Sequence, residues 1–338
     1  MKKKKQDVGQ IVALERKLLK CRADFKLSNF KYKNAFDHIT ALEKEISSVL
    51  KITRKFPVKE IKPHTKSING DGVAVVVMSD WHYEEEVKPE TVNGLNEFNL
   101  KIANQRIENA WQNSHKLIQA ASRDNDIHTV VIALLGDFIS SSIHDELMVL
   151  NQLGAAPAMF AVQKKIAEGI QFLLTNTDKN FVVHCIAGNH PRLTKKIRHA
   201  TFTENSLEVY MYYNLAQYFR KEPRIKFNIP ESAISYMDIL NQKVRLHHGH
   251  YVKYQGGIMG LTVPARKAIN EWNASIPADI TIIGHYHTLT DGGFFLINGS
   301  IIGFNAYAMS LKCRFEEPRQ LFFLINKHGR TGYTKIVV

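Results

Sequence analysis

The sequence predicts an α/β fold with a basic helical arm in front of it. Three observations support this division. Short apolar runs alternate with helical patterns from residue 73 onward, which is typical of an α/β body. The first 66 residues carry helical spacing instead. They also hold 18 Lys and Arg against 7 Asp and Glu, whereas the other 272 residues hold 27 against 25. We therefore expect a helical arm and linker over residues 1–66 and an α/β domain over residues 67–338.

The arm has apolar residues at helical spacing in two stretches, and the pattern weakens between Phe25 and Tyr32. This predicts two helices, at about 8–27 and 34–55, although the pattern also fits one long bent helix. An apolar stripe on a helix must pack on something. We expect it to contact the body or to form a homodimer with a second copy of the arm.

The positive charge of the arm favours a polyanion as partner, and nucleic acid is the first candidate. The alternative is a solvated helical face that is rich in lysine. Pro57 and Pro63 then mark a linker that reaches about Gly72.

Five runs in the body are short and apolar enough to be strands buried on both faces. They are Val73–Met78, Thr129–Leu135, Phe181–Ile186, Val244–Leu246 and Ile280–Ile283. Helical patterns lie between them, at residues 98–122, 145–174, 203–220 and 260–273. Glycines near the C-terminus separate two further apolar runs, Phe294–Ile297 and Leu321–Ile325. These last runs predict consecutive antiparallel strands that form a second sheet.

The composition excludes several classes of protein. No apolar run reaches the ~18–20 residues that a membrane span needs, and no apolar stretch of signal-peptide length follows the basic start. The three cysteines are far apart, which argues against a disulfide framework and a zinc ribbon. We therefore expect a cytoplasmic protein without a membrane partner.

Polar side chains of only a few kinds follow the five predicted strands. The strands are followed in turn by Asp80-Trp81-His82, Gly136-Asp137, Gly188-Asn189-His190, His247-His248-Gly249-His250 and Gly284-His285-Tyr286-His287. Ligands of open α/β sheets bind outside the carboxyl ends of the strands. In an extended segment, residues i and i+2 point the same way, so Asp80 and His82 address one point, as do His285 and His287.

Such a mixture of carboxylate, amide and imidazole groups suits Mn²⁺, Fe²⁺ or Zn²⁺. Taken singly, each motif is more often a turn or a core histidine, but their occurrence at five strand ends in order favours a metal site. The ligands are too many for one tetrahedral zinc ion. We therefore predict two divalent ions that share one carboxylate.

The order DxH, GD, GNH, H and GHxH resembles the calcineurin-like metallophosphoesterase superfamily over about residues 70–338. The resemblance implies a two-sheet βαβ sandwich with helices outside and two bound ions. We expect Mn²⁺ in both positions, with Fe²⁺ or Zn²⁺ as alternatives. The chain also looks like phage-type members, and its core motifs are similar to those of the double-strand-break-repair nucleases.

The same resemblance implies roles for eight residues. The ligands of the first ion are Asp80, His82 and His287, the bridging carboxylate is Asp137, and the ligands of the second ion are Asn189, His248 and His285. His190 is the catalytic histidine, which contacts the phosphate and protonates the leaving oxygen. His248 fits the family's H-G-x pattern better than His247 or His250.

Two departures from the family pattern bear on function. Pro191 stands where many members carry an acidic residue that orients the histidine, so His190 needs another partner. The arginine of the GDxVDRG motif in the protein phosphatases of the superfamily has no match after Asp137, which disfavours a protein phosphatase.

The run 191–199 places four cations next to His190, and these could hold a phosphate backbone. The candidate substrate-binding residues are His144, Arg192, Lys195, Lys196 and Arg198. A solvated basic turn is the alternative. The acidic patch Glu84–Glu86 has no role in this scheme. The first functional hypothesis is a metal-dependent DNA nuclease. The alternatives are a small-molecule or cyclic-nucleotide phosphodiesterase, and a non-enzymatic assembly or scaffold protein that docks through its helical arm.

Overall fold

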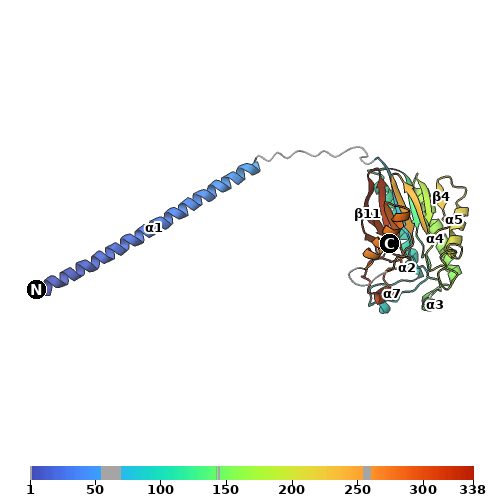
Figure 1. Ribbon diagram of the computed structural model, residues 1–338, viewed down its shortest axis with the longest axis horizontal. Coiled ribbons are helices and arrows are strands. Elements are labelled where there is room, and N and C mark those ends of the chain that lie inside the picture. Colours follow the sequence, from blue (N-terminus) through green and yellow to red (C-terminus); the bar gives the residue numbers. More distant parts are fainter. Residues whose placement is uncertain (1, 55–69, 142, 144, 254–259) are drawn as a thin grey trace. The chain divides into compact units, whose positions relative to one another are not determined.

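The computed structural model describes residues 2–54, 70–141, 143, 145–253 and 260–338 (Figure 1). The chain divides into two units, Met1–Pro63 and His64–Val338. The predicted boundary between residues 66 and 67 lies outside the described residues, and so does the linker with Pro57 and Pro63.

The first unit contains one continuous helix, α1 (Lys2–Arg54), with side chains described for residues 11–44. The prediction of two helices is therefore wrong, and the alternative of a single helix holds. The segment between Phe25 and Tyr32 contains no proline or glycine, so nothing in it breaks the backbone hydrogen bonds of a helix.

The second unit is built on a six-stranded sheet in the order β11-β10-β1-β2-β3-β4. Four strands run parallel: β1 (Asp71–Met78), β2 (Asp126–Leu134), β3 (Asn180–Cys185) and β4 (Ile225–Asn228). The last two strands of the chain, β10 (Arg319–Asn326) and β11 (Gly329–Val337), join this sheet antiparallel on the other side of β1.

A second sheet has five strands in the order β5-β6-β7-β9-β8. The strands are β5 (Ile234–Ile239), β6 (Gln242–His247), β7 (Ile280–Ile283), β8 (Thr290–Asp291) and β9 (Phe295–Ile297). A second sheet formed by consecutive antiparallel C-terminal strands is therefore incorrect, because β7 and β9 pair parallel and β10 returns to β1. The reason is visible in β10, which is apolar on both faces and so belongs inside a covered sheet.

The two sheets and their helices form layers. Val75 and Val77 of β1 face the second sheet, where they pack with Val244 and Leu246. The alternate β1 residues, such as Val76, face α2 (Leu100–Ala121), α4 (Ala155–Asn176) and α5 (Leu207–Tyr218). The outer face of the second sheet is covered by α6 (Thr262–Ser275). Three short helices complete the body: η1 (Pro89–Val92), α3 (Leu147–Leu150) and α7 (Ala306–Ser310).

The predicted fold class, an α/β body of two sheets with an N-terminal helix, is confirmed. The predicted helix at 145–174 is divided into α3 and α4, which begins after Gly154. Among the helices in the described ranges, none has the length and apolar composition needed to span a bilayer. Three of the strands followed by chemical motifs belong to the first sheet and two to the second, so the carboxyl ends of both sheets contribute to one site.

Candidate metal centre

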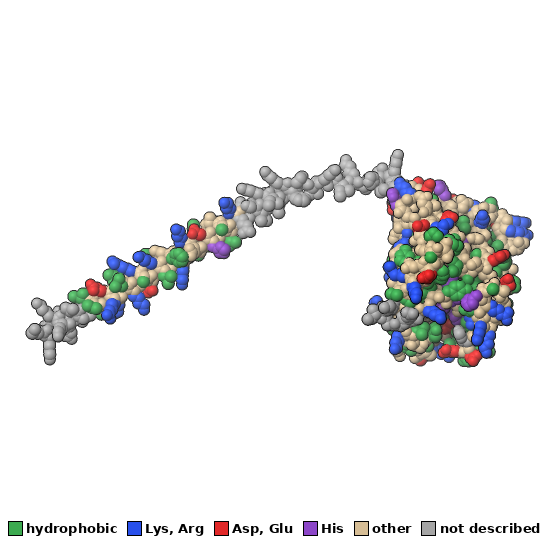
Figure 2. All heavy atoms as spheres, viewed as in Figure 1, with side chains coloured by type: hydrophobic (Ala, Val, Ile, Leu, Met, Phe, Trp, Pro, Cys, Tyr) green, Lys and Arg blue, Asp and Glu red, His purple; other side chains and the backbone are tan. Residues whose placement is uncertain are grey.

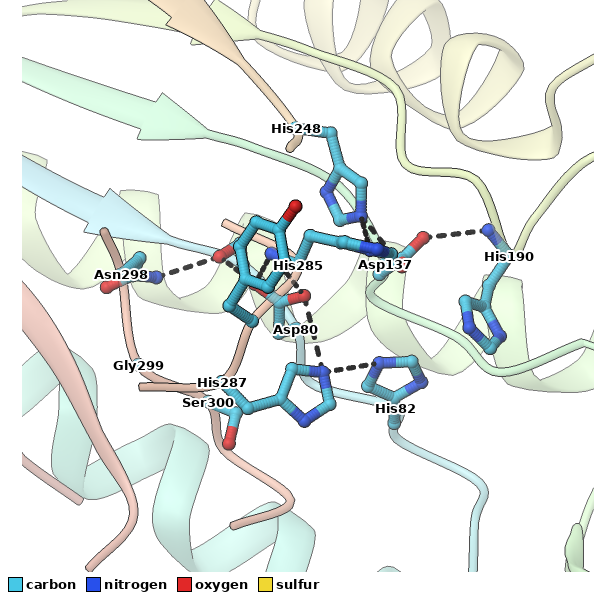
Figure 3. A network of polar contacts seen from close by, with 12 residues as sticks. Asp80, His82, Asp137, His190, His248, His285, His287, Asn298, Gly299 and Ser300 are labelled. Carbon is cyan, nitrogen blue, oxygen red and sulfur yellow. Dashed lines mark hydrogen bonds and ion pairs between the residues drawn. The ribbon is translucent and has the colours of Figure 1, made fainter. Parts of the chain in front are cut away.

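Loops from five strands bring acidic, amide and imidazole side chains together (Figure 3). β1 is followed by Asp80 and His82, β2 by Asp137, β3 by Asn189 and His190, β6 by His248, and β7 by His285 and His287. Three sets have ligand atoms within 4.8 Å of one another: Asp80, His82 and His287; His82, Asp137 and His190; Asp137, His248 and His285.

The first set joins the ends of β1 and β7. His287 Nε2 lies 3.5 Å from Asp80 Oδ1 and 3.2 Å from His82 Nε2. His82 is buried, and burial followed by the charge of His190 lowers its pKa well below the usual value. Ring nitrogens this close can offer lone pairs to one point, which is the arrangement a cation requires.

The third set joins the ends of β2, β6 and β7. His248 Nε2 lies 2.8 Å from Asp137 Oδ2 and 3.2 Å from His285 Nδ1. Since His248 Nδ1 donates to Leu135 O at 2.6 Å, the neutral ring directs a lone pair from Nε2 at the carboxylate oxygen. Two acceptors at this distance need a proton or a cation between them. Burial opposes the charged ring, but Asp137 raises the pKa of His248 to about 9, so a proton holds this position without a cation.

Asn189 provides an independent test of the fit to a cation. Its side-chain oxygen, Oδ1, is buried and has no hydrogen-bond partner among the described residues. A buried amide oxygen without a partner costs free energy, and a hard or borderline cation would satisfy it. The residues present therefore fit two divalent ions. Asp137 would be the ligand shared by the ions, since it belongs to two of the three sets, one with His82 and His190 and one with His248 and His285.

The backbone of the centre is unusual at its ligand positions. Five residues have left-handed φ angles: Asp80 (55°), His82 (46°), Asp137 (53°), His285 (71°) and His287 (55°). The loops after β2 and β3 also approach each other very closely. A Cβ atom at Gly136 would lie 2.1 Å from Gly188 N, and one at Gly188 would lie 2.1 Å from Asp137 Oδ1. These glycines are required because the two loops pack backbone against backbone.

A polar network behind β1 holds Asp80. Ser79 Oγ donates a hydrogen bond to Asp80 Oδ2, and Asn298 Nδ2 donates to Ser79 Oγ at 2.8 Å (Figure 3). Gln320 Oε1 accepts from Ser79 N at 2.8 Å, and the backbone N–H of His285 donates to both carboxylate oxygens of Asp80 at 3.0 Å. Asn298 and Gln320 lie far from the motifs in sequence, so no local pattern could have identified them.

A second network holds His82. Ser140 Oγ donates to Glu85 Oε2 at 2.8 Å, so it must accept the hydrogen bond from His82 Nδ1, also at 2.8 Å. This order places the ring proton on Nδ1 and directs Nε2 toward His287. Asn305 Nδ2 donates to the other oxygen of Glu85 at 3.0 Å. Part of the acidic patch thus has a structural explanation, because the Glu85 carboxylate points inward.

His190 takes its orientation from the segment after Asp137. Its backbone N–H donates to Asp137 Oδ1 at 2.8 Å, and its Nδ1 donates to the carbonyl oxygen of Ser140 at 3.0 Å. Pro191 stands where an acidic residue could have oriented the histidine, and the main-chain carbonyl of Ser140 orients it instead. Ser140 therefore contacts a predicted ligand through its side chain and the predicted catalytic histidine through its backbone.

Glu208 of α5 connects the loops after β2 and β3. It is fully buried, and its two oxygens accept from Phe138 N and Gly188 N, each at 2.7 Å. Burial, reinforced by the nearby charge of Asp137, raises the pKa of Glu208 to about 8. Sequence analysis missed this residue, since one glutamate inside a helix carries no signal of such a role.

The remaining predicted substrate contacts are mostly at the surface. His144 lies outside the described residues. Arg192 uses its guanidinium on carbonyl oxygens of its own loop, Asn189 O at 2.5 Å and Thr194 O at 3.1 Å, so it braces the segment behind a predicted ligand. The other three predicted cations are exposed: Lys195, Lys196 and Arg198.

The two histidines next to His248 lie outside the three ligand sets. The ring of His247 stacks on Tyr251 at 4.9 Å and contacts Trp272 at 5.4 Å, between ring centroids. The His250 ring lies 5.7 Å from that of His248. His248, which the sequence pattern favoured over these two, is the histidine that contacts Asp137.

No protein-family profile matches the chain, and no curated protein matches it. Several solved structures are similar to it. An archaeal phosphodiesterase is 13% identical, with 78% of this chain and 99% of that chain covered and a TM-score of 0.35. Vacuolar protein sorting 29 from Cryptosporidium parvum is 13% identical, with coverages of 78% and 98% and a TM-score of 0.32. A predicted phosphoesterase from Streptococcus pneumoniae is 11% identical, with coverages of 78% and 97% and a TM-score of 0.28. At these values, activity has to be argued from the side chains of the centre itself.

Proposed function

We propose that the chain is a phosphodiester hydrolase that uses two divalent metal ions, with Mn²⁺ as the first candidate. The observation that carries the proposal is that Asp137 belongs to two of the three ligand sets. The Asn189 oxygen, which has no hydrogen-bond partner among the described residues, and the oriented ring of His190 support it. The ions would supply neutralisation of the phosphoryl oxygens and activation of water near neutral pH.

The residues of the chain supply the rest of the chemistry. The Nδ1 of His190 donates to the Ser140 carbonyl, which orients the ring, and Nε2 would exchange a proton with the substrate. In its protonated form this ring acts as the general acid that neutralises the departing oxygen. Asp137 holds the backbone of His190, so the bridging carboxylate and the acid keep a fixed spacing.

DNA is the proposed substrate. The exposed cations Lys195 and Lys196 lie five and six residues after His190, and we expect them to contact phosphates next to the cleaved bond. The basic arm adds net positive charge that attracts a polyanion. The resemblance of the core motifs to the double-strand-break-repair nucleases also supports this choice. The three free cysteines support a reducing cytoplasm as the place of action.

The experiment measures hydrolysis of labelled single- and double-stranded DNA with Mn²⁺. Two chemical variants, His190→Ala and Asp137→Asn, are compared with wild type, and we expect a loss of about 10²–10⁴-fold for the general acid. The surface variant Lys195→Ala/Lys196→Ala should weaken DNA binding in a salt-dependent way. Its control is Lys101→Ala/Lys267→Ala, which removes two exposed lysines from α2 and α6.

Each outcome has a defined meaning. Cleavage that survives both His190→Ala and Asp137→Asn would refute the proposed centre. Hydrolysis of bis-p-nitrophenyl phosphate without cleavage of DNA would keep the chemistry and replace DNA by a small substrate. Absence of both activities in the metal-loaded wild type would support the non-enzymatic assembly protein.

A further inference from the structure

The exposed apolar side chains of α1 include one continuous series. Along the described part of the helix, positions separated alternately by three and four residues are Ile11, Leu14, Leu18, Cys21, Phe25, Ser28, Tyr32, Ala35, Ile39 and Leu42. Only Ser28 in this series is polar. The series is a heptad repeat with Ile11 at position a and Leu14 at position d, and it continues without interruption through the segment between Phe25 and Tyr32. Such a repeat over more than four heptads is the signature of a coiled coil.

We call these ten positions the seam. Its apolar residues are exposed to solvent. Leu18 is 53% exposed, Phe25 67%, Tyr32 79% and Ile39 53%. Figure 2 shows hydrophobic and basic side chains side by side along α1. A long helix with an exposed apolar seam needs a partner with the same 3.5-residue period, because only such a partner keeps contact over its whole length.

We propose that α1 forms an antiparallel coiled coil with α1 of a second copy of this chain. The choice of orientation follows from side-chain size. A parallel in-register pair would place Phe25 on Phe25 and Tyr32 on Tyr32, with Ser28 on Ser28 in the layer between them. Overfilled layers would then alternate with underfilled ones, and both are destabilising.

An antiparallel pair avoids this mismatch of side-chain sizes. In the register that we propose, the numbers of the two residues in each layer add up to 53. It places Phe25 against Ser28 of the second copy and Tyr32 against Cys21, and it places Leu18 against Ala35. The outer layers then pair Ile11 with Leu42 and Leu14 with Ile39. Every large residue in the middle of the seam therefore meets a small one.

The flanking charges favour the same orientation. In the antiparallel register, Asp24 at position g faces Lys31 of the second copy, and symmetry makes this contact twice. In the parallel register, Lys17 would face Arg22 of the second copy, also twice. The first arrangement attracts and the second repels.

The first experiment measures the mass of the full-length chain in solution. We expect a dimer of twice 38.6 kDa for wild type. The variant Leu18→Glu/Ile39→Glu changes two seam positions and should be monomeric. The control Leu19→Glu/Leu27→Glu changes two exposed leucines that lie off the seam and should stay dimeric. Near-ultraviolet circular dichroism checks that the body of each variant remains folded.

Three results would overturn the proposed interface: a monomeric wild type, a dimeric seam variant, or a control that dissociates as readily as the seam variant. None of them depends on the proposed hydrolase activity. A higher oligomer that needs the seam would refute the two-stranded coil.

The second experiment tests orientation with the native Cys21. In a Cys313→Ser background, Cys185 is buried, so Cys21 is the exposed thiol available for oxidation. The antiparallel coil places the two Cys21 residues eleven residues apart along the axis, about 16 Å at 1.5 Å per residue. No covalent dimer should form on oxidation with copper–phenanthroline. Adding Tyr32→Cys should produce one, because that position faces Cys21 of the second copy.

The control for this experiment is Cys21→Ser/Tyr32→Cys in the same background, which should again give no covalent dimer. Rapid cross-linking through Cys21 alone would refute the antiparallel orientation, because facing d positions belong to a parallel pair. Absence of a covalent dimer in the variant that carries Cys21 and Tyr32→Cys would refute the register.

Discussion

Replacing Ser140 by alanine separates the two roles of this residue. The side chain orients His82, whereas the carbonyl oxygen that accepts from His190 Nδ1 belongs to the backbone and remains in Ser140→Ala. The variant therefore removes the hydroxyl between His82 Nδ1 and Glu85 Oε2, two contacts of 2.8 Å each. Glu85 keeps its other oxygen on Asn305 at 3.0 Å.

The size of the effect follows from these contacts. Loss of a buried hydrogen bond to a charged carboxylate costs about 1.5–3 kcal/mol of folding free energy. Removal of a group that orients a metal-ligating histidine weakens metal affinity about 10–100-fold. We therefore expect Ser140→Ala to bind Mn²⁺ at least tenfold more weakly than wild type. At saturating Mn²⁺ its turnover should stay close to wild type, because the contact to His190 is retained.

Calorimetric titration of Mn²⁺ into the metal-free chain measures the affinity, and chemical unfolding in chelator measures the stability. The matched control is Ser114→Ala in α2, which removes a buried hydroxyl that donates a hydrogen bond of 2.7 Å to Ala110 O within the same helix. It should lose about 1 kcal/mol of stability and no Mn²⁺ affinity. Equal affinities for wild type and Ser140→Ala would refute the idea that this hydroxyl orients His82.

Three further predictions concern pH, loop geometry and metal removal. Burial lowers the pKa of His184 from 6.5 to about 4. The unfolded chain therefore binds an extra proton between these pH values. The stability of the fold should be highest above pH 6.5, and its free energy of unfolding should fall by about 3 kcal/mol as the pH drops to 4. Urea unfolding of His184→Gln should show a smaller loss over this range, and an equal loss would assign the acid sensitivity to other groups. Glu208→Gln keeps the shape of the side chain but turns an NH₂ donor toward the backbone donor Phe138 N or Gly188 N. The free energy of unfolding of this variant should therefore be about 2 kcal/mol lower than that of wild type, and its affinity for Mn²⁺ should be weaker. An unchanged Mn²⁺ affinity in calorimetric titration would contradict this. Saturating Mn²⁺ at 100 times its dissociation constant should stabilise the fold by about 2.7 kcal/mol, and chelator should remove this gain. Asp137→Asn should unfold at the same temperature with and without Mn²⁺ in a thermal scan, and a shift equal to that of wild type would exclude Asp137 as a ligand.

The sequence predicted the α/β class and the strands that supply the centre because both leave local signals. Valine-rich runs mark buried strands, and DxH or GHxH after such a run marks a ligand pair. Assignment of strands to sheets has no such signal. β6 and β7 looked like β1 and β2 in composition, yet they belong to the second sheet, and β10 looked like an end strand but lies next to β1.

The groups that orient the ligands could not be predicted for a related reason. Ser140 contacts Glu85 across 55 residues of chain, and Asn298 contacts Ser79 across 219. Only the packed loops bring these pairs together. The serines after Asp137 are also typical of a helix start, so their sequence does not reveal the contacts that Ser140 makes. The heptad series of α1 was obscured in another way, because the polar Ser28 weakens the apolar pattern between Phe25 and Tyr32 until the whole series is counted.

The left-handed backbone at five predicted ligand positions sets a limit on how stable this fold can be. Each non-glycine residue in that region costs about 1–2 kcal/mol. The five together approach the net folding free energy of an entire domain, about 5–15 kcal/mol. Replacing Asp80 or His285 by glycine would remove the conformational strain of the left-handed backbone, but it would also remove the predicted ligand. Selection for stability alone should therefore remove predicted ligands. A variant library screened only for folding should accumulate proteins that lack these side chains and are more stable than this chain.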